Sequence, residues 1–180
     1  MRSAASRCLV QLGVVVIHAD EVAREVLAPS TPGAEWVARR WPDVVTEGVV
    51  DRAALGRLVF SDPQALAALE AITHPETRER IHRLVDASRD QDIAVEMPIL
   101  RDWFSDEWVT VVVDAPEQLR IERVQRREAE MTRKDVAAVM ERQPSRASWL
   151  LAADFVVDNG GSIAQLCAEC ERVLALVGAT

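Results

Sequence analysis

Four short runs rich in valine are the feature that most constrains how this chain of 180 residues folds. Each run is continuously apolar rather than alternating, which is typical of parallel strands buried on both faces of a sheet. The runs are 14–17, 93–96, 109–114 and 155–158. Because segments with helical punctuation separate them, the pattern predicts a layered α/β fold with a parallel sheet.

The segments between the strands carry the cap and turn residues of helices. Asp51 is placed to cap a helix over 52–60, and Asp62-Pro63 is placed to begin another that ends near Thr73. We expect His74-Pro75 to break that helix and to open the next, because proline lacks the N–H that a helix interior uses. Further helices are expected at 21–27, 116–127, 132–142, 145–153 and 162–177.

Composition narrows the class of protein. Acidic residues outnumber basic ones and leave a net charge of −8, which argues against non-specific binding to nucleic acid. No apolar run approaches the roughly 18–20 residues of a membrane span, and no signal-peptide pattern is present. The 3 cysteines are too few for a disulfide scaffold and fit a reducing compartment. We therefore expect a cytoplasmic protein, monomeric, with neither nucleic acid nor membrane as a partner.

Cys167 and Cys170 have the spacing of metal ligands, but we expect no zinc there. Both lie on one apolar stripe at helical spacing, where a free cysteine behaves as a small hydrophobic residue. The stripe consists of Ile163, Leu166, Cys167, Cys170, Val173, Leu174 and Val177. No second cysteine pair accompanies it, so the sequence predicts a packed helix face.

Asp20 follows the first predicted strand by three residues. Ligands of parallel α/β sheets bind beyond the carboxyl ends of the strands, and a carboxylate there can accept a proton or bind a hydroxyl. The alternative interpretation is that Asp20 only caps the helix over 21–27. Arg24 lies one helical turn further on, so the two side chains share a face. They form either a solvated ion pair or part of a pocket for an anionic substrate.

Four arginines gather around the end of the helix predicted at 116–127. They are Arg120, Arg123, Arg126 and Arg127. Arginines at a helix C-terminus are favoured by the helix dipole, so a solvated helix end is one interpretation. The other is a phosphate clamp on a mobile lid, because guanidinium groups match phosphate oxygens in a bidentate geometry.

Several blocks of the sequence resemble the dephospho-CoA kinase family, in the family's order and at close to its spacing. Residues 12–26 are similar to L-G-x-x-V-I-D-A-D-x-I-A-R-x-V, and 29–33 to a P-G-x-x-G turn. Residues 152–161 resemble A-A-D-x-V-I-D-N-x-G, and blocks 51–60, 69–75 and 109–116 also match. The resemblance implies an α/β, P-loop NTPase-like three-layer fold with a parallel sheet. It implies a single domain over 1–180, with a helical CoA-binding region at about 28–90 and a short lid at about 126–148.

The implied reaction is transfer of the ATP γ-phosphoryl group, with Mg²⁺, to the ribose 3′-hydroxyl of dephospho-CoA. By the resemblance, Asp20 is the catalytic carboxylate that orients or deprotonates this hydroxyl, and it contacts the substrate. Arg24, His74 and Pro75 match substrate-binding positions.

The ATP side also follows from the resemblance. Arg127 matches the catalytic lid arginine that closes on the ATP phosphates, with Arg126 as the second choice, and Asn159 lies in the block expected near the adenine. Counting back from Gly13 places Arg2 and Ser3 where the family has the Lys and Ser of its P-loop, so Ser3 matches the Mg²⁺ ligand.

The sequence also departs from the family pattern. Met1 and Arg2 stand at the Gly and Lys positions, and a forked guanidinium does not simply replace a compact ammonium. His18 replaces the first Asp of D-A-D, and Arg101 stands at a position that is usually Glu. We expect impaired turnover, and strands with unpaired ladders where the family has a central strand. A start further upstream, a frameshift and a decayed paralogue remain open explanations. The alternative functions are a non-catalytic homologue that binds CoA-like nucleotides and a scaffold for interactions.

Overall fold

The computed structural model describes residues 3–99, 103–105, 107–127, 132 and 144–178. They form two compact units, which are described separately. The inserted unit is Val15–Ile99, and the terminal unit combines Met1–Val14 with Leu100–Thr180. None of the helices within these described ranges is long and apolar enough to cross a membrane.

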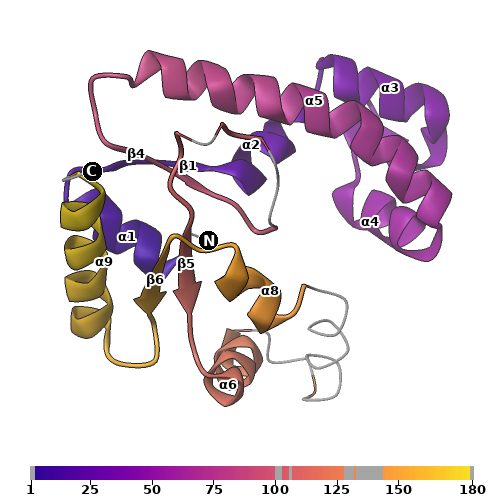
Figure 1. The fold of residues 1–180 in the computed structure, drawn as a ribbon. Helices are drawn as coiled ribbons and strands as arrows, with labels where there is room; N and C mark the ends of the chain where they lie inside the picture. Colours follow the sequence, from indigo (N-terminus) through magenta and orange to yellow (C-terminus); the bar gives the residue numbers. More distant parts are fainter. Residues whose placement is uncertain (1–2, 100–102, 106, 128–131, 133–143, 179–180) are drawn as a thin grey trace. The chain divides into compact units, whose positions relative to one another are not determined.

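The inserted unit is built on two parallel strands with helices beside them (Figure 1). Strand β1 (Val15–His18) pairs with β4 (Ile93–Glu96), and the register places His18 opposite Glu96. Both strands lie within one residue of the predicted runs. Helix α2 (Ala19–Val26) follows β1 directly and packs against α5 (Pro63–Ala87).

A small helical region lies between α2 and α5. In chain order it contains α3 (Pro32–Arg40), η1 (Pro42–Val44), β2 (Val45–Thr46), β3 (Val49–Val50) and α4 (Arg52–Ser61). Its core is formed by Ala34, Val37, Val44, Val50 and Leu55. Asp51 caps α4 by accepting hydrogen bonds from the N–H groups of Ala53 and Ala54, as predicted. The antiparallel β2–β3 hairpin and α3 are elements that the sequence analysis did not predict.

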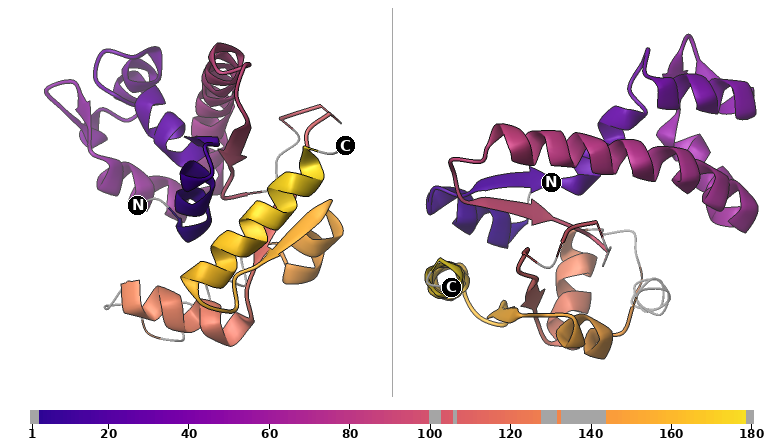
Figure 2. Two further views of the ribbon diagram at one scale, coloured as in Figure 1. Left: turned by 90° about the vertical axis from the view of Figure 1, so that its left-hand side faces the viewer. Right: turned by 45° about the horizontal axis from the view of Figure 1, so that its top comes forward.

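Helix α5 corrects the predicted break at His74-Pro75, because it runs from Pro63 to Ala87 with Pro75 inside it. Figure 2 shows this helix as one continuous long helix. Pro75 cannot donate a hydrogen bond to the carbonyl of Ala71, so the helix loses one internal bond. The helix persists because its other face packs on α2, where Thr77 and Ile81 are buried. Tertiary packing therefore outweighs the local preference. Asp62 caps α5 with Pro63 in its first turn, as predicted.

The terminal unit contains the second parallel strand pair. Its elements are α1 (Ala4–Gln11), β5 (Val111–Asp114), α6 (Glu117–Arg127), α8 (Arg146–Leu151), β6 (Phe155–Asp158) and α9 (Ile163–Val177). Ser145 caps α8, and Ser162 forms a capping box with Gln165 at the start of α9. Strand β5 begins two residues later than predicted. Apart from Thr132, the helix predicted at 132–142 lies outside the described residues, as does most of the lid predicted at 126–148.

Helices α1 and α9 pack together in the core of the terminal unit, and β6 lies against α9 (Figure 1). The buried cluster there consists of Ala5, Cys8, Val157, Leu166, Cys170 and Val173. This confirms the middle of the predicted apolar stripe of α9 but corrects two of its members, since Ile163 is 58% exposed and Cys167 is bonded. Cys167 is not a free thiol, because it forms a disulfide with Cys8 of α1. Sequence spacing within α9 carries no information about a partner 159 residues away.

Both long-range strand pairings are parallel, which confirms the predicted strand type. They form separate two-stranded sheets, so that in the described part of the chain β4 and β5 each pair with a single neighbour.

Candidate active site

Asp20 lies just beyond the carboxyl end of β1, in the first turn of α2. The interpretation of Asp20 as a helix cap is wrong, because α2 begins at Ala19 and His18 occupies the N-cap position. The Asp20 side chain is exposed and makes no hydrogen bond or ion pair with any other described residue. A carboxylate in the first turn is favoured by the helix dipole. Asp20 is thus held at a strand end with its oxygens available to a ligand.

His18 is joined to Glu96 across the same edge of the strands. The His18 Nδ1 atom lies 2.6 Å from Glu96 Oε2, and the two side chains are 10% and 38% exposed. The parallel register sets this contact, because it pairs the last residues of β1 and β4. Sequence reasoning missed Glu96 as a site residue. The available signal was its position at the end of a valine-rich run, because ligands of parallel sheets bind beyond the carboxyl ends of the strands.

Arg24 lies in the last turn of α2, with its side chain exposed. Its backbone carbonyl accepts a hydrogen bond from the guanidinium of Arg52. No ion pair joins Arg24 to Asp20 among the described residues, so the interpretation of the two as a solvated pair is wrong. Both side chains remain on a helix that packs against α5, the helix that carries His74 and Pro75.

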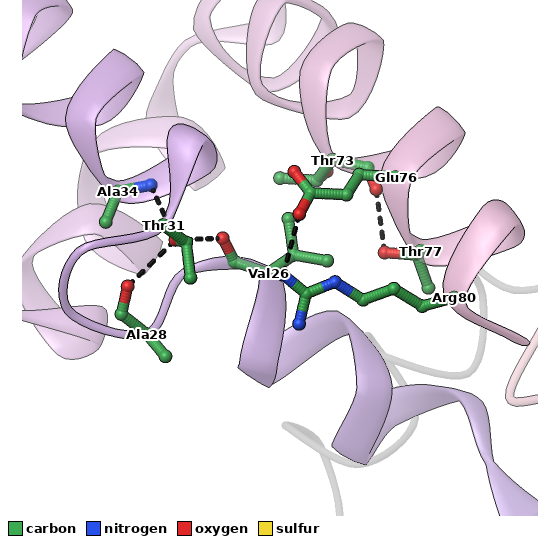
Figure 3. Close-up of polar contacts among 8 residues, drawn as sticks. All are labelled: Val26, Ala28, Thr31, Ala34, Thr73, Glu76, Thr77 and Arg80. Atoms are coloured by element: carbon green, nitrogen blue, oxygen red, sulfur yellow. Dashed lines mark hydrogen bonds and ion pairs between the residues drawn. The ribbon is translucent and has the colours of Figure 1, made fainter. Parts of the chain in front are cut away.

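Helix α5, which packs against α2, carries several polar bonds between its own residues (Figure 3). The Thr77 hydroxyl donates to the Thr73 carbonyl at 2.7 Å, and Arg80 Nη2 lies 2.7 Å from Glu76 Oε1. His74 Nε2 lies 3.8 Å from Glu70 Oε1, one turn away on the same helix. His74 therefore lies in α5, the helix that packs against α2.

The turn between α2 and α3 fixes the end of α2. The Thr31 hydroxyl donates to the carbonyls of Val26 and Ala28 at 2.6 and 2.8 Å, and it accepts from the Ala34 N–H (Figure 3). A Cβ atom at Gly33 would lie 2.5 Å from the Val26 oxygen, so α3 approaches α2 more closely than any other residue allows there. The block 29–33, predicted as a turn, therefore ends inside a helix.

In the terminal unit, polar contacts gather at the carboxyl ends of β5 and β6. Arg123 of α6 donates to the carbonyl of Asn159, which follows β6, at 2.8 Å. Arg146, the first residue of α8, makes a bidentate pair with Asp114 at the end of β5, with Nη2 2.6 Å from Oδ2. The Arg120 Nε atom is buried without a hydrogen-bond partner among the described residues. Three arginines therefore converge on this edge.

The Asp114–Arg146 pair has an electrostatic consequence. The hydrogen bonds from Arg146 hold the pKa of Asp114 below its ordinary value, and the charges of Arg146 and Arg120 act in the same direction. Asp114 in turn raises the pKa of Arg146. Sequence analysis missed both residues of the pair. Asp114 was visible as the polar end of a strand, but its partner lies 32 residues away.

The predicted ATP-side residues also belong to the terminal unit. Arg126 and Arg127 lie in the last turn of α6 with exposed side chains. Ser3 is the N-cap of α1, and its hydroxyl accepts a hydrogen bond from the Ser6 N–H at 3.1 Å. Arg2 and Arg101 lie outside the described residues. The structure thus groups the predicted ATP-side residues in one unit and the predicted substrate-side residues in the other.

Known proteins are similar in amino-acid sequence to nearly the whole of this chain. The family model for dephospho-CoA kinase matches residues 2–165. A dephospho-CoA kinase from Frankia casuarinae is 41% identical over 177 residues, which cover 96% of this chain and 76% of that protein. Another from Thermobifida fusca is 38% identical and covers 96% of this chain and 88% of that protein.

Solved structures agree with the sequence relatives. A Thermus thermophilus protein of known crystal structure superimposes with a TM-score of 0.81 at 32% identity, covering 95% of this chain and 88% of that one. The dephospho-CoA kinase from Campylobacter jejuni superimposes with a TM-score of 0.71 at 24% identity over 98% and 92%, which supports the fold alone. The chain therefore has the P-loop NTPase-like fold, and it belongs to the dephospho-CoA kinase family, a family of phosphotransferases.

Proposed function

We propose that this chain transfers the γ-phosphoryl group of ATP to the ribose 3′-hydroxyl of dephospho-CoA. The observation that carries the proposal is the Asp20 carboxylate, exposed at the carboxyl end of β1 and without a partner among the described residues. The oxygen of the ribose 3′-hydroxyl attacks the γ-phosphorus, and ADP leaves. The Asp20 carboxylate accepts the proton of that hydroxyl during the attack. A positioned carboxylate of this kind contributes about 10²–10⁴-fold to a rate.

The dephospho-CoA side of the site consists of Arg24 with His74 and Pro75. Arg24 presents an exposed guanidinium on the helix that carries Asp20, and guanidinium groups bind phosphate oxygens in a bidentate geometry. Dephospho-CoA carries a diphosphate, which such a group recognises. The packing of α2 on α5 supports the assignment of His74 and Pro75 to the same side.

The ATP side consists of Arg127 or Arg126, Asn159 and Ser3, with Mg²⁺. Magnesium on a nucleotide is held mainly by phosphates and water and needs few protein ligands. The Ser3 hydroxyl accepts a hydrogen bond from the Ser6 N–H and lies 2.9 Å from the Ser6 hydroxyl. When Ser3 donates to that hydroxyl it retains one lone pair, so it fits this requirement. Bound Mg²⁺ supplies charge neutralisation at the phosphate oxygens. Arg126 and Arg127 offset the remaining negative charge of the ATP phosphates.

The proposal also includes that the chain acts as a monomer in the cytoplasm.

We further expect the 180 residues as they stand to turn over slowly, because they contain no Gly-Lys-Ser phosphate loop. A preorganised cradle of backbone N–H groups is usually the largest contribution to phosphoryl transfer. The measurement is CoA formation by purified protein, followed chromatographically over hours. Turnover in the range typical of kinases, about 1–100 s⁻¹, would contradict this expectation.

Asp20→Asn tests the proposed role directly. We expect the rate of CoA formation to fall by about 10²-fold or more while the Kd for dephospho-CoA, from calorimetry, stays within about threefold. Glu21→Gln is the matched control, since Glu21 is an exposed carboxylate in the same helical turn and should leave both quantities unchanged. Equal losses of binding and turnover would assign Asp20 a structural role.

The unmodified chain separates the remaining alternatives in the same experiment. Binding of dephospho-CoA without any CoA formation would indicate a non-catalytic homologue. Absence of both binding and turnover in folded protein would indicate a scaffold.

A further inference from the structure

Cys8 and Cys167 are brought together by the packing of two helices rather than by nearness in sequence. Their Cα atoms are 5.0 Å apart, although the residues are separated by 159 positions. Cys8 belongs to the buried cluster that also contains Ala5 and Leu166, and Cys167 packs against that cluster. The apolar core therefore holds the two sulfur atoms within reach of each other, so the pair is preorganised for oxidation.

The three cysteines differ in access to solvent. Cys8 is 2% exposed, Cys167 is half-buried, and Cys170 is 3% exposed. Burial and the charge of Glu169 raise the pKa of Cys170 and so disfavour its thiolate. Thiol–disulfide exchange proceeds through an accessible thiolate. Small reagents therefore reach the sulfur of Cys167 first. Cys8 is placed to attack the mixed disulfide that forms on Cys167, and Cys170 takes no part in the reaction.

We propose that Cys8 and Cys167 form a reversible thiol–disulfide pair whose oxidant is a small disulfide of the glutathione class. The Cys167 thiolate attacks one sulfur of glutathione disulfide, whose S–S bond breaks, and one glutathione leaves with the proton that Cys167 has lost. The Cys8 thiolate then attacks Cys167, and the second glutathione leaves with the proton of Cys8. In total two cysteine thiols are oxidised and one glutathione disulfide is reduced to two glutathiones.

The pair has a structural consequence, since it ties α1 to α9 at opposite ends of the chain. Disulfides of proteins that act in a reducing compartment are usually transient, catalytic or redox-sensing. The inference concerns only thiol chemistry within the terminal unit, so it stands independently of the proposed kinase activity. No activity measurement is needed to test it.

The first test is a redox titration of the full chain. Folded protein is equilibrated with mixtures of reduced and oxidised glutathione and is then denatured in N-ethylmaleimide, which alkylates free thiols. The mass of the protein, measured by mass spectrometry, gives the number of alkylated cysteines. We expect an alkylation count that changes from three to one in a single step as the oxidised fraction rises, with Cys170 labelled throughout, and that returns to three on reduction. Three labels in every mixture, or one label in every mixture, would overturn the proposal.

The second test uses the difference in access between the two sulfurs. With glutathione disulfide, folded Cys8→Ser should accumulate one adduct on Cys167, at least about tenfold faster than folded Cys167→Ser accumulates one on Cys8. Cys170→Ser is the control and should titrate like the unmodified protein. Equal adduct rates in the first two variants, both confirmed as folded by circular dichroism, would contradict the assigned order of attack.

Discussion

Single carboxylates at strand ends hold distant segments in place in both units. Glu96 ends β4 and contacts His18, while Asp114 ends β5 and contacts Arg146. Each carboxylate belongs to the last residue of a strand in a parallel pair. Its side chain contacts a residue that is distant in the sequence. The edge at which α/β proteins bind ligands is therefore also an edge fixed by side-chain contacts of carboxylates.

The stability of the terminal unit should depend on the ionisation of Asp114. Its pKa is lowered in the folded state, so its contribution is present above the unfolded pKa of about 3.9 and is lost as the pH falls through the folded value. Asp114→Asn should therefore lower the urea midpoint at neutral pH and flatten the fall of stability in acid. The measurement is urea unfolding between about pH 3 and pH 7.

The control for this prediction is Glu169→Gln. Arg172 also lowers the pKa of Glu169, but that carboxylate is 35% exposed against 17% for Asp114. Solvent screens exposed pairs, so the control should change the curve much less. Parallel pH curves for the unmodified protein and Asp114→Asn would refute the role of the pair.

At the scale of elements, α5 shows packing prevailing over a local break. The helix passes through Pro75, whose side chain is exposed, while Thr77 and Ile81 are buried on the opposite side. The hydroxyls of Thr73 and Thr77 donate to the carbonyls of Leu69 and Thr73 and so supplement the helix around the proline. Pro75 thus lies in the middle of α5, although proline disfavours the interior of a helix.

Pro75→Ala should therefore stabilise the protein. An interior proline costs about 3 kcal/mol relative to alanine, and removing it returns about 1 kcal/mol of entropy to the unfolded chain. We expect a net gain of up to about 2 kcal/mol in the free energy of unfolding, measured by urea denaturation. Pro63→Ala is the control, since proline suits the first turn of α5, and it should slightly destabilise. A loss of stability in Pro75→Ala would show that the ring makes a favourable contact.

At the scale of the whole molecule, the terminal unit is assembled from both ends of the chain. The inserted unit comes between these two segments in the sequence. The disulfide between α1 and α9 closes a loop with a sequence separation of 159 residues. Closing so long a loop removes many conformations from the unfolded state, and little of this benefit depends on contacts in the folded state.

Reduction should consequently lower the stability of the chain. We expect a loss of about 2–4 kcal/mol and a fall in Tm of about 5–15 °C, measured by thermal melting with and without a phosphine reductant. Cys170→Ser should keep this sensitivity, whereas Cys8→Ser should melt at one temperature under both conditions. A Tm that does not respond to the reductant in the unmodified protein would rule out a stabilising disulfide.

The sequence alone predicted the features that depend on neighbouring residues. The runs that became β4 and β6 and the caps Asp51 and Asp62 come from local patterns of a few residues, and the family resemblance comes from several such blocks in order. Each cap bonds to an N–H two or three positions away, so its energy is decided within one turn. Asp20 was found in the same way, from its distance to a strand end.

Only the tertiary structure decided the contacts between distant residues. His18 meets Glu96 across 78 positions, Arg146 meets Asp114 across 32, and Cys167 meets Cys8 across 159. Packing against α2 also decided that α5 continues through Pro75, against its local preference. Such contacts depend on which core faces are buried together, and burial is a property of the assembled chain rather than of any short segment.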